Sequence, residues 1–360
     1  MSPLDPGATI GIVGTGQLGR MLAVAAAKLG FRVHTFGPEA DPPAARVADA
    51  HIAAAYDDEA SLRAFAAQVD AATYEFENIP PETVRILQDA GIPVRPGARI
   101  LAVCQDRIAE KTFLRECGLT TAPFHAVDDL ASLEAAARSL GGRGILKTRR
   151  FGYDGKGQAR ISAETDLAAA YEHCGQSPCV LEGFVDFDCE VSQVAARGVD
   201  GDMAFYDLPR NEHADGILRR SIVPAGVGTD IEAQARDLTA KVMEALDYVG
   251  VLAVEYFVHP DEGLIANEIA PRVHNTGHWT HEACMVGQFE QHIRAVAAWP
   301  LGNPARHSNA IMTNLIGAEA NDWLRLTVQA DLSVTLYGKA EARPGRKMGH
   351  TVALSERSDS

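Results

Sequence analysis

The 360-residue sequence predicts a mixed protein, α/β in its first part and α+β beyond it, built from three consecutive blocks. From Ala8 to about Pro96, short apolar segments alternate with helical stretches, which is the pattern of a parallel sheet with right-handed crossovers. From Thr121 to about Val185 the order becomes strand, helix, strand, glycine-rich loop, strand, helix, strand. Beyond about Cys189 long strands dominate. At about 150 residues per domain, the length also predicts two or three domains.

The first block reads as a small doubly wound unit. Proline at position 81 suits the first turn of a helix, where its missing N–H costs nothing. We expect strands at Ala8–Val13, Arg32–Phe36, His51–Ala54 and Ala71–Glu75. We expect helices at Gln17–Leu29, Asp58–Gln68 and Pro81–Asp89.

The prolines at Pro93 and Pro96 mark the end of this block. Gly97–Cys117 then reads as one or two helices, and the last block contains helical patterns at Asp230–Leu246 and about Thr280–Trp299. Residues Ser355–Ser360 are expected to be frayed. The predicted domains are residues 1–97, 98–185 and 186–360.

Composition excludes several classes of protein. The net charge of −15 opposes a nucleic-acid surface, because neutralising phosphates needs a basic face. The longest apolar run, Met21–Ala27, is far shorter than the roughly 20 residues that cross a bilayer, and the first residues lack a secretion signal. The six cysteines form no Cys-x-x-Cys pair and are expected to be reduced. We therefore expect a cytoplasmic protein with neither a nucleic-acid nor a membrane partner.

A glycine cluster follows the first predicted strand. Gly14, Gly16 and Gly19 satisfy G-x-G-x-x-G before a helix, where backbone amides hold a phosphate. A dinucleotide-dependent oxidoreductase is therefore one candidate. Glu39 stands about 20 residues further on but does not directly end the second strand, so the phosphate interpretation is favoured over the dinucleotide one. A tight turn without a ligand remains an alternative.

The central block reads as a nucleotide clamp. Lys147 lies on the short apolar strand Gly144–Thr148, and the glycine-rich stretch Gly152–Gln158 follows. Glycines free a backbone to fold over phosphates, and lysines supply positive charge. Further on, Glu182 ends an apolar strand before Gly183, as in an interdomain hinge that contacts a nucleobase. An exposed basic hairpin and an ordinary strand end are the alternatives.

The third block contains a predicted hairpin with two glutamates. If its turn centres between Asp261 and Glu262, Glu255 lies directly opposite Glu268. Like charges that face each other are destabilising unless a cation or proton joins them, and carboxylates suit Mg²⁺ that bridges nucleotide phosphates. Two exposed glutamates on a solvated face are the alternative.

Basic and imidazole side chains follow this hairpin. Arg272, with His274 and Asn275, is interpreted as an anion site, and a zinc site built from histidines is disfavoured because Gly277 interrupts a regular helix. Lys339, Arg346 and Lys347 form a local basic cluster in an acidic chain, which indicates a small phosphorylated ligand. A solvated basic loop is the alternative there.

In this order, these stretches resemble the ATP-grasp superfamily and, more closely, its N5-carboxyaminoimidazole ribonucleotide synthetase family. The stretches that carry the resemblance are Gly14–Met21, Gly152–Gln158, Glu182–Val185, Asn267–Trp279 and Leu336–His350. The resemblance implies a Rossmann-like N-terminal domain, a small lid domain and a C-terminal antiparallel-sheet domain. It also implies a homodimer.

The resemblance further implies a role for individual residues. Implied ATP contacts are Arg107, Lys147, Gly152, Tyr153, Asp154, Gly155, Lys156, Gly157, Gln158, Glu182, Gly183, Phe184, Val185, Glu190, His213, Asn267 and Glu268. Implied ribonucleotide contacts are Gln17, Leu18, Glu75, Tyr153, Asp154, Arg272, His274, Asn275, Lys339, Arg346 and Lys347. Implied catalytic residues are Arg272, Lys156 and Asp154, and implied magnesium ligands are Glu255 and Glu268. Many superfamily members carry an asparagine two residues beyond the second glutamate, where this chain has Ala270.

The implied reaction is an ADP-forming ligation in purine biosynthesis. ATP, with Mg²⁺, would activate bicarbonate as carboxyphosphate, and the amine of 5-aminoimidazole ribonucleotide would take up the carboxyl group. Within the superfamily the alternatives are another ligase or a formate-dependent glycinamide ribonucleotide transformylase. Outside it, the alternatives are the oxidoreductase and a nucleotide-binding protein without activity.

Overall fold

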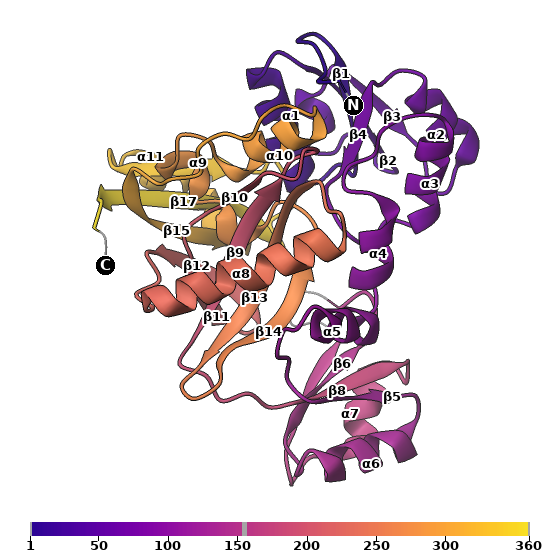
Figure 1. The fold of residues 1–360 in the computed structure, drawn as a ribbon, viewed down its shortest axis with the longest axis vertical. Coiled ribbons are helices and arrows are strands. Elements are labelled where there is room, and N and C mark those ends of the chain that lie inside the picture. Colours follow the sequence, from indigo (N-terminus) through magenta and orange to yellow (C-terminus); the bar gives the residue numbers. More distant parts are fainter. Residues whose placement is uncertain (1, 153–156, 359–360) are drawn as a thin grey trace.

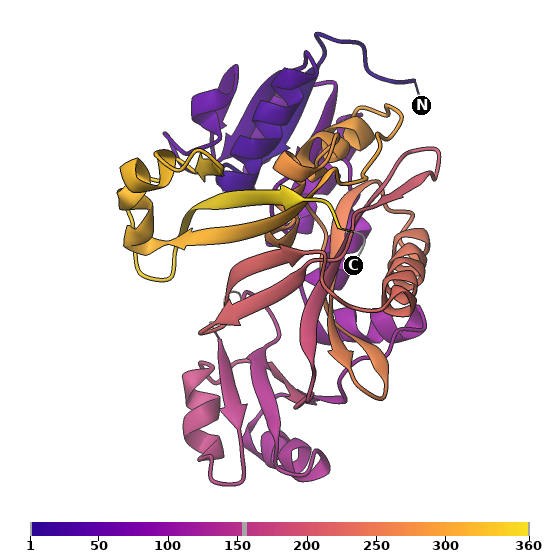
Figure 2. The same ribbon diagram turned by 90° about the vertical axis from the view of Figure 1, so that its left-hand side faces the viewer.

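The computed structural model describes residues 2–152 and 157–358 and contains three sheets (Figure 1). The N-terminal sheet lies at one end of the molecule, a large sheet occupies the middle, and a small sheet lies at the other end (Figures 1 and 2). The mixed α/β and α+β fold is confirmed. No helix of the described residues is long and apolar enough to cross a membrane. All six cysteines are free and lie within the described ranges.

The N-terminal sheet is parallel, with strand order β3-β2-β1-β4. Its strands are β1 (Thr9–Val13), β2 (Arg32–Gly37), β3 (Ala50–Ala53) and β4 (Ala71–Tyr74). Its helices are α1 (Gln17–Lys28), α2 (Glu59–Ala66) and α3 (Pro81–Asp89), with a 3₁₀ turn η1 (Ala45–Val47). Ile10 and Ile12 face α1, whereas Val13 belongs to the cluster that contains Phe65 of α2. Apolar side chains on both faces are what a parallel sheet requires, and every predicted element of this block is confirmed within two residues of its ends.

Two short helices, α4 (Ala98–Cys104) and α5 (Arg107–Glu116), lead to the lid sheet. This antiparallel sheet has strand order β5-β8-β6-β7. Its elements are β5 (Phe124–Val127), α6 (Leu130–Ser139), β6 (Gly144–Thr148), β7 (Gln158–Ile161), α7 (Leu167–His173) and β8 (Cys179–Gly183). The order predicted from the sequence is confirmed. The apolar faces of the two helices close the small core of this unit.

The large sheet has nine strands, eight of them in the order β14-β13-β9-β11-β12-β15-β17-β16, and β10 pairs with β9. Its strands are β9 (Cys189–Arg197), β10 (Met203–Phe205), β11 (Arg210–Ala214), β12 (Ile217–Val223), β13 (Gly250–His259), β14 (Gly263–Ala270), β15 (Ser308–Ile316), β16 (Leu332–Leu336) and β17 (Lys347–Glu356). Its other elements are α8 (Thr229–Ala245), α9 (Thr280–Ala283), α10 (Gln288–Val296) and α11 (Trp323–Thr327), with the 3₁₀ turns η2 (Asn275–Gly277) and η3 (Gly317–Asp322). All pairings are antiparallel.

Two expectations for the last block are wrong. The single helix expected at about Thr280–Trp299 is two helices, because Cys284 is extended and Gly287 passes so close to Thr280 O that a Cβ there would lie 3.0 Å from it. The expected fraying does not begin at Ser355. Ser355 and Glu356 are the last residues of β17 and pair with Asn309 and Ser308 of β15.

His292 of α10 joins the N-terminal sheet to the large sheet. Its Nδ1 accepts the Val251 N–H at 3.0 Å, so Nε2 carries the proton and faces Thr73 Oγ1 of β4 at 2.7 Å. The ring is fully buried, and this burial lowers the pKa of His292 to about 4. The imidazole is therefore neutral in the folded protein at neutral pH.

The buried, neutral His292 predicts that the free energy of unfolding falls as the pH is lowered. With a pKa of about 4 folded and about 6.5 unfolded, the neutral His292 contributes its full share of stability above pH 6.5 and loses about 3 kcal/mol of it by pH 4, because only the unfolded chain takes up the proton in that window. We expect His292→Gln to be less stable than the wild type at pH 7.5, with the gap narrowing as the pH falls in urea-unfolding measurements. The exposed His307→Gln is the control, and a gap of constant size would contradict this account.

Candidate active site

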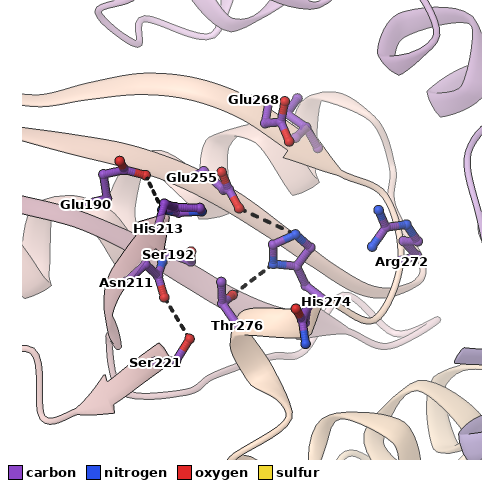
Figure 3. Close-up of polar contacts among 12 residues, drawn as sticks. Glu190, Ser192, Asn211, His213, Ser221, Glu255, Glu268, Arg272, His274 and Thr276 are labelled. Carbon is purple, nitrogen blue, oxygen red and sulfur yellow. Dashed lines mark hydrogen bonds and ion pairs between the residues drawn. The ribbon is translucent and has the colours of Figure 1, made fainter. Parts of the chain in front are cut away.

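Glu255 of β13 lies directly opposite Glu268 of β14, as the hairpin arithmetic predicts (Figure 3). The assumed turn is wrong by one residue. A turn centred between Asp261 and Glu262 would pair His259 with Leu264, whereas His259 pairs with Gly263 in the structure. A register shift between Glu255 and Tyr256 compensates, leaving Asn267 as the extra residue of a bulge in β14. Bulges re-aim side chains beside functional sites. The two carboxylates come together through this irregularity.

The electrostatics of the pair favour a cation. Burial and the facing Glu268 raise the pKa of Glu255 to about 7, whereas Arg107 and Lys147 outweigh burial and lower the pKa of Glu268. Beside them, Asn267 Oδ1 is buried with no hydrogen-bond partner. Two carboxylates and a free amide oxygen are the hard oxygen ligands that Mg²⁺ takes in phosphate sites. The residues therefore fit this metal. The described residues contain no cluster of three or more His, Cys, Asp or Glu side chains arranged as a self-sufficient metal site, so nucleotide phosphates would have to complete the coordination.

Helix α5 brings a positive charge to the second glutamate. Asp106 caps this helix by accepting from the N–H groups of Ile108 and Ala109, and Arg149 pairs with the same carboxylate at 2.7 Å. The first turn is thereby fixed, and its Arg107 NH1 lies 3.2 Å from Glu268 Oε2. The NH2 group of Arg107 also reaches Gly152 O at 3.4 Å, at the start of the glycine-rich loop. Arg107 thus lies between the glutamate pair and the loop, as expected of a phosphate contact.

Glu182 at the end of β8 binds two lysines. Its Oε2 lies 2.9 Å from Lys147 Nζ and 3.2 Å from Lys111 Nζ, and its Oε1 is buried without a partner. Burial alone would raise the pKa of Glu182, but Lys147, Lys111 and Arg107 lower it to about 2. The sequence analysis identified Lys147 and Glu182 but missed Lys111. Lys111 sits four residues after Arg107 on the same helix, and this spacing was the available signal.

The residues after Glu182 in the predicted hinge, Gly183 to Val185, differ in their surroundings. The ring of Phe184 is flanked by the guanidinium groups of Arg143 and Arg160, at 4.8 and 4.6 Å from its centroid. The side chain of Phe184 is therefore in contact with two cations of the lid. Gly183 and Phe184 also line an open cavity of about 470 Å³ on the lid, which includes no other predicted site residue. Val185 directly follows and is partly buried.

Further along the large sheet, Glu190 of β9 pairs with His213 of β11 at 3.0 Å (Figure 3). Burial alone would lower the pKa of His213, but Glu190 and Glu255 raise it. Both predicted nucleotide residues therefore lie within electrostatic reach of the glutamate pair. Asn211 and Ser192, which the sequence analysis did not single out, hydrogen-bond at 2.6 Å beside them.

The glycine-rich turn before α1 is filled by a side chain of the protein itself. The two carboxylate oxygens of Glu75 accept the backbone N–H groups of Gly16 and Gly19, the latter at 2.6 Å. Burial raises the pKa of Glu75, and the positive charges of Arg272 and Lys339 act in the opposite direction. The expected phosphate contact at this turn is therefore wrong for the described conformation, because an internal carboxylate takes those amides. Gln17 and Leu18 form the first turn of α1 beside it.

Arg272, next to the end of β14, is held by a carboxylate that the sequence analysis did not assign. Its Nε and NH2 lie 2.6 and 3.3 Å from the two oxygens of Glu77. Arg272 outweighs burial and lowers the pKa of Glu77. The guanidinium is thereby fixed, and its charge reaches both Glu75 and Glu268.

His274 and Asn275 follow Arg272. His274 Nδ1 lies 2.8 Å from Thr276 Oγ1, and Nε2 lies 3.5 Å from Glu255 Oε1 (Figure 3). Asn275 exchanges two amide hydrogen bonds with Asn314 of β15, at 3.0 and 2.7 Å. Burial and Arg272 lower the pKa of His274 well below its usual value. The neighbouring histidine, His278, has its Nδ1 3.0 Å from Gln288 Nε2, so His274 and His278 each contact a polar side chain of the protein.

The basic cluster near the C-terminus lies against the N-terminal domain. Arg46 NH1 donates to Gly338 O at 2.9 Å, and Lys339 Nζ donates to Lys347 O at 2.7 Å. Arg346 donates to Glu341 O at 3.1 Å. The charge of Lys347 acts on His274 and His213, and that of Lys339 acts on Glu75. Lys339 and Lys347 therefore lie within electrostatic reach of ribonucleotide candidates from distant parts of the chain, whereas the side chain of Arg346 contacts Glu341.

Part of the predicted loop lies outside the described residues: Tyr153, Asp154, Gly155 and Lys156. Two flanking residues are described. Gly157 adopts φ +67°, and its carbonyl accepts the Thr148 N–H at 2.8 Å, which joins β6 to β7 next to Gln158.

The antiparallel lid sheet, the large antiparallel sheet and the acidic and basic cluster at their junction define an ATP-grasp protein. Three family models match the chain in order: the ribonucleotide synthetase preATP-grasp domain over residues 7–105, the ATP-grasp domain over 112–289, and the phosphoribosylaminoimidazole carboxylase C-terminal domain over 310–360. The chain is 51% identical over 356 residues to the N5-carboxyaminoimidazole ribonucleotide synthase of Brucella melitensis, covering 98% of both chains. The chain belongs to the N5-carboxyaminoimidazole ribonucleotide synthase family and is an ADP-forming ligase.

Solved structures agree with this assignment. The Staphylococcus aureus synthetase complexed with ADP is 37% identical and has a TM-score of 0.94, with 99% of this chain and 95% of that chain covered. The Aspergillus clavatus synthase in complex with ADP and 5-aminoimidazole ribonucleotide is 27% identical and has a TM-score of 0.91, with 98% and 94% covered.

Lys147 offers a direct test of the nucleotide site. We expect Lys147→Ala to weaken ATP binding about ten- to a hundredfold in calorimetry, because a charge-assisted contact to phosphate contributes about 1.5–3 kcal/mol. Lys241→Ala, on the outer face of α8, is the control. Equal ATP affinity in the two variants would contradict the assignment of Lys147 as a phosphate contact.

Proposed function

We propose how this chain carries out the ATP-dependent carboxylation of 5-aminoimidazole ribonucleotide to N5-carboxyaminoimidazole ribonucleotide, a step of purine biosynthesis. The carbon donor is bicarbonate and the metal is Mg²⁺. ATP occupies the junction between the lid sheet and the large sheet, with Arg107 and Lys147 at its phosphates and the backbone after Glu182 at its base. We propose the unit boundaries 1–97, 98–185 and 186–360.

Glu255 and Glu268 would hold the magnesium, and Asn267 Oδ1 would be available as a further oxygen ligand. When bound, Mg²⁺ neutralises charge on the transferring phosphoryl group. Arg107 and Lys147 supply the remaining positive charge, so the γ-phosphoryl group passes to a bicarbonate oxygen and gives carboxyphosphate and ADP. The lid loop shields carboxyphosphate from water. Lys156 and Asp154, which lie outside the described residues, are assigned to this loop from the resemblance alone.

The ribonucleotide lies beside the nucleotide, with Lys339, Arg346 and Lys347 at its phosphate and Gln17, Leu18, His274 and Asn275 around it. Glu75 faces its amine, and Arg272 orients the carboxyl donor. The amine nitrogen attacks the carboxyl carbon, or the CO₂ released from it, and the C–O bond to phosphate breaks. Inorganic phosphate leaves, and the amine proton passes to it.

One observation carries this proposal. The acidic pair, with Arg107 and Lys147 beside it, lies within electrostatic reach of Arg272, whose charge also acts on Glu75. We assign Arg272 to a second site that binds the ribonucleotide, which a protein that only binds a nucleotide would not need. An oxidoreductase would need the amides that Glu75 occupies.

Oxygen-labelled bicarbonate tests the reaction. We expect one labelled oxygen in each inorganic phosphate, because the oxygen that accepts the phosphoryl group leaves with it. The assay contains ATP, Mg²⁺ and the ribonucleotide, and carbonic anhydrase is excluded so that the label does not exchange. Unlabelled phosphate from a turning-over enzyme would contradict phosphoryl transfer to bicarbonate. Turnover with formate and glycinamide ribonucleotide in place of these substrates would support the transformylase instead.

The homodimer and the cytoplasmic location are parts of this proposal that rest on the family and on the sequence respectively. Light scattering of the purified protein at micromolar concentration tests the first.

A further inference from the structure

Glu268 lies on an edge strand. Strand β14 ends the large sheet, so the backbone groups on its outer side have no strand to pair with. Buried backbone groups need a partner, and unpaired edges are usually covered. The covering segment here runs from α5 to the residues just after it, and Figure 1 shows α5 beside the end of β14. Thr120 O accepts the N–H of Ala266 at 2.8 Å.

Two consecutive side chains of α5 bind the backbone on either side of Glu268. Glu110 Oε1 accepts the N–H of Ile269 at 2.7 Å, and Lys111 Nζ donates to the carbonyl oxygen of Asn267 at 3.2 Å. Both side chains are almost fully buried, with residue exposures of 3% for Glu110 and 1% for Lys111. Both side chains are thus packed against the protein, where they bind backbone groups rather than solvent.

The same helix face also holds the side chain between those two backbone groups. Arg107 precedes Glu110 by three residues and Lys111 by four, so all three point to one side of α5, and Arg107 pairs with the Glu268 carboxylate. The peptide before Glu268, its carboxylate and the peptide after it are thus each bound by one residue of this face. Lys111 also contacts Glu182, which connects the metal strand to the lid.

We propose that Glu110 and Lys111 are positioning residues that fix the backbone on both sides of Glu268 and thereby set the place of its carboxylate for Mg²⁺. The bulge at Asn267 makes this support necessary, because a bulged edge strand has lost part of its ladder at the point where the ligand projects. Residues that orient a metal ligand typically change metal affinity or activity 10- to 100-fold when they are removed. This inference rests on the magnesium site proposed above.

The test compares Glu110→Ala, Glu110→Gln and the control Glu116→Ala, which alters an exposed glutamate on the same helix. In Glu110→Ala we expect about a 10- to 100-fold rise in the Mg²⁺ concentration that half-saturates both turnover and calorimetric ADP binding, with a much smaller change in kcat at saturating Mg²⁺. Hydrogen exchange at the Ile269 amide should accelerate, with or without metal. Glu110→Gln should restore both properties, since its amide oxygen can accept the same hydrogen bond.

A purely structural role would lower the unfolding temperature but leave the half-saturating Mg²⁺ concentration unchanged, and that result overturns the inference. So does a Glu110→Gln variant as impaired as Glu110→Ala. If Glu110→Ala does not fold, Lys111→Met removes the other contact at similar length, and the same rise in half-saturating Mg²⁺ is expected. Glu268→Gln separates the two proposals. If it shifts the Mg²⁺ dependence and the helix variants do not, only the positioning inference fails, whereas no shift in any variant removes the magnesium site as well.

Discussion

Glu268→Gln should lose turnover by about a hundredfold or more while keeping the fold. The substitution preserves the shape of the side chain but removes a negative charge that faces Glu255 and pairs with Arg107 at 3.2 Å. A neutral amide is a poor Mg²⁺ ligand, and Arg107 loses its partner. The measurement is ADP release at increasing Mg²⁺ concentrations, together with a melting curve.

The control is Glu262→Gln, in the exposed turn of the same hairpin, which should behave like the wild type. Near-normal turnover of Glu268→Gln at saturating Mg²⁺ would refute the assignment of Glu268 as a ligand.

Gly14→Ala should be the most destabilising single-methyl change in the N-terminal domain. Gly14 adopts φ +103°, and a Cβ on it would overlap Cγ of Glu75 and lie 3.1 Å from the ring of Phe76. The backbone strain alone costs about 1–3 kcal/mol. In addition, Glu75 would have to leave the amides of Gly16 and Gly19. We expect a loss of about 3 kcal/mol or more in urea unfolding, and weaker binding of the ribonucleotide.

Gly7→Ala is a matched control for this variant. Gly7 has a similar φ of +92°, but an added Cβ would meet no atom within 4 Å. It should therefore lose only the stability that the backbone strain costs, about 1–2 kcal/mol. Equal losses in the two variants would show that contact with Glu75 plays no part.

Local patterns were enough to predict most of the fold. Alternating apolar segments placed the strands of the parallel sheet, and Pro81 placed the start of α3 at the correct residue. The pairing of Glu255 with Glu268 was also predicted, yet through a turn that is one residue shorter than assumed and a bulge that restores the register. A bulge depends on tertiary packing at the sheet edge, so alternation along one strand cannot reveal it.

The partners that define the site were much harder to predict. Glu77 binds Arg272 from 195 residues away, and Glu110 binds the Ile269 amide from 159 residues away. Single-sequence patterns extend over a few residues, and no periodicity links such pairs. The contacts of Glu75 with the amides of Gly16 and Gly19 were not predicted for the same reason. A carboxylate after one strand of a parallel sheet can fold back onto the glycine turn that follows its neighbour, and only the strand order β1-β4 makes that contact possible.

The carboxylate seated on the glycine turn has a metabolic consequence. Nicotinamide dinucleotides are abundant in cells and could compete for any glycine turn of this type whose amides are free. A ligase that bound them there would be inhibited to an extent that varied with their concentration. Because Glu75 already binds the amides of Gly16 and Gly19, an incoming pyrophosphate would find those donors taken by a carboxyl group of the protein. The enzyme is therefore expected not to bind NAD⁺ or NADPH at this turn, although the turn follows the glycine pattern of dinucleotide-binding proteins.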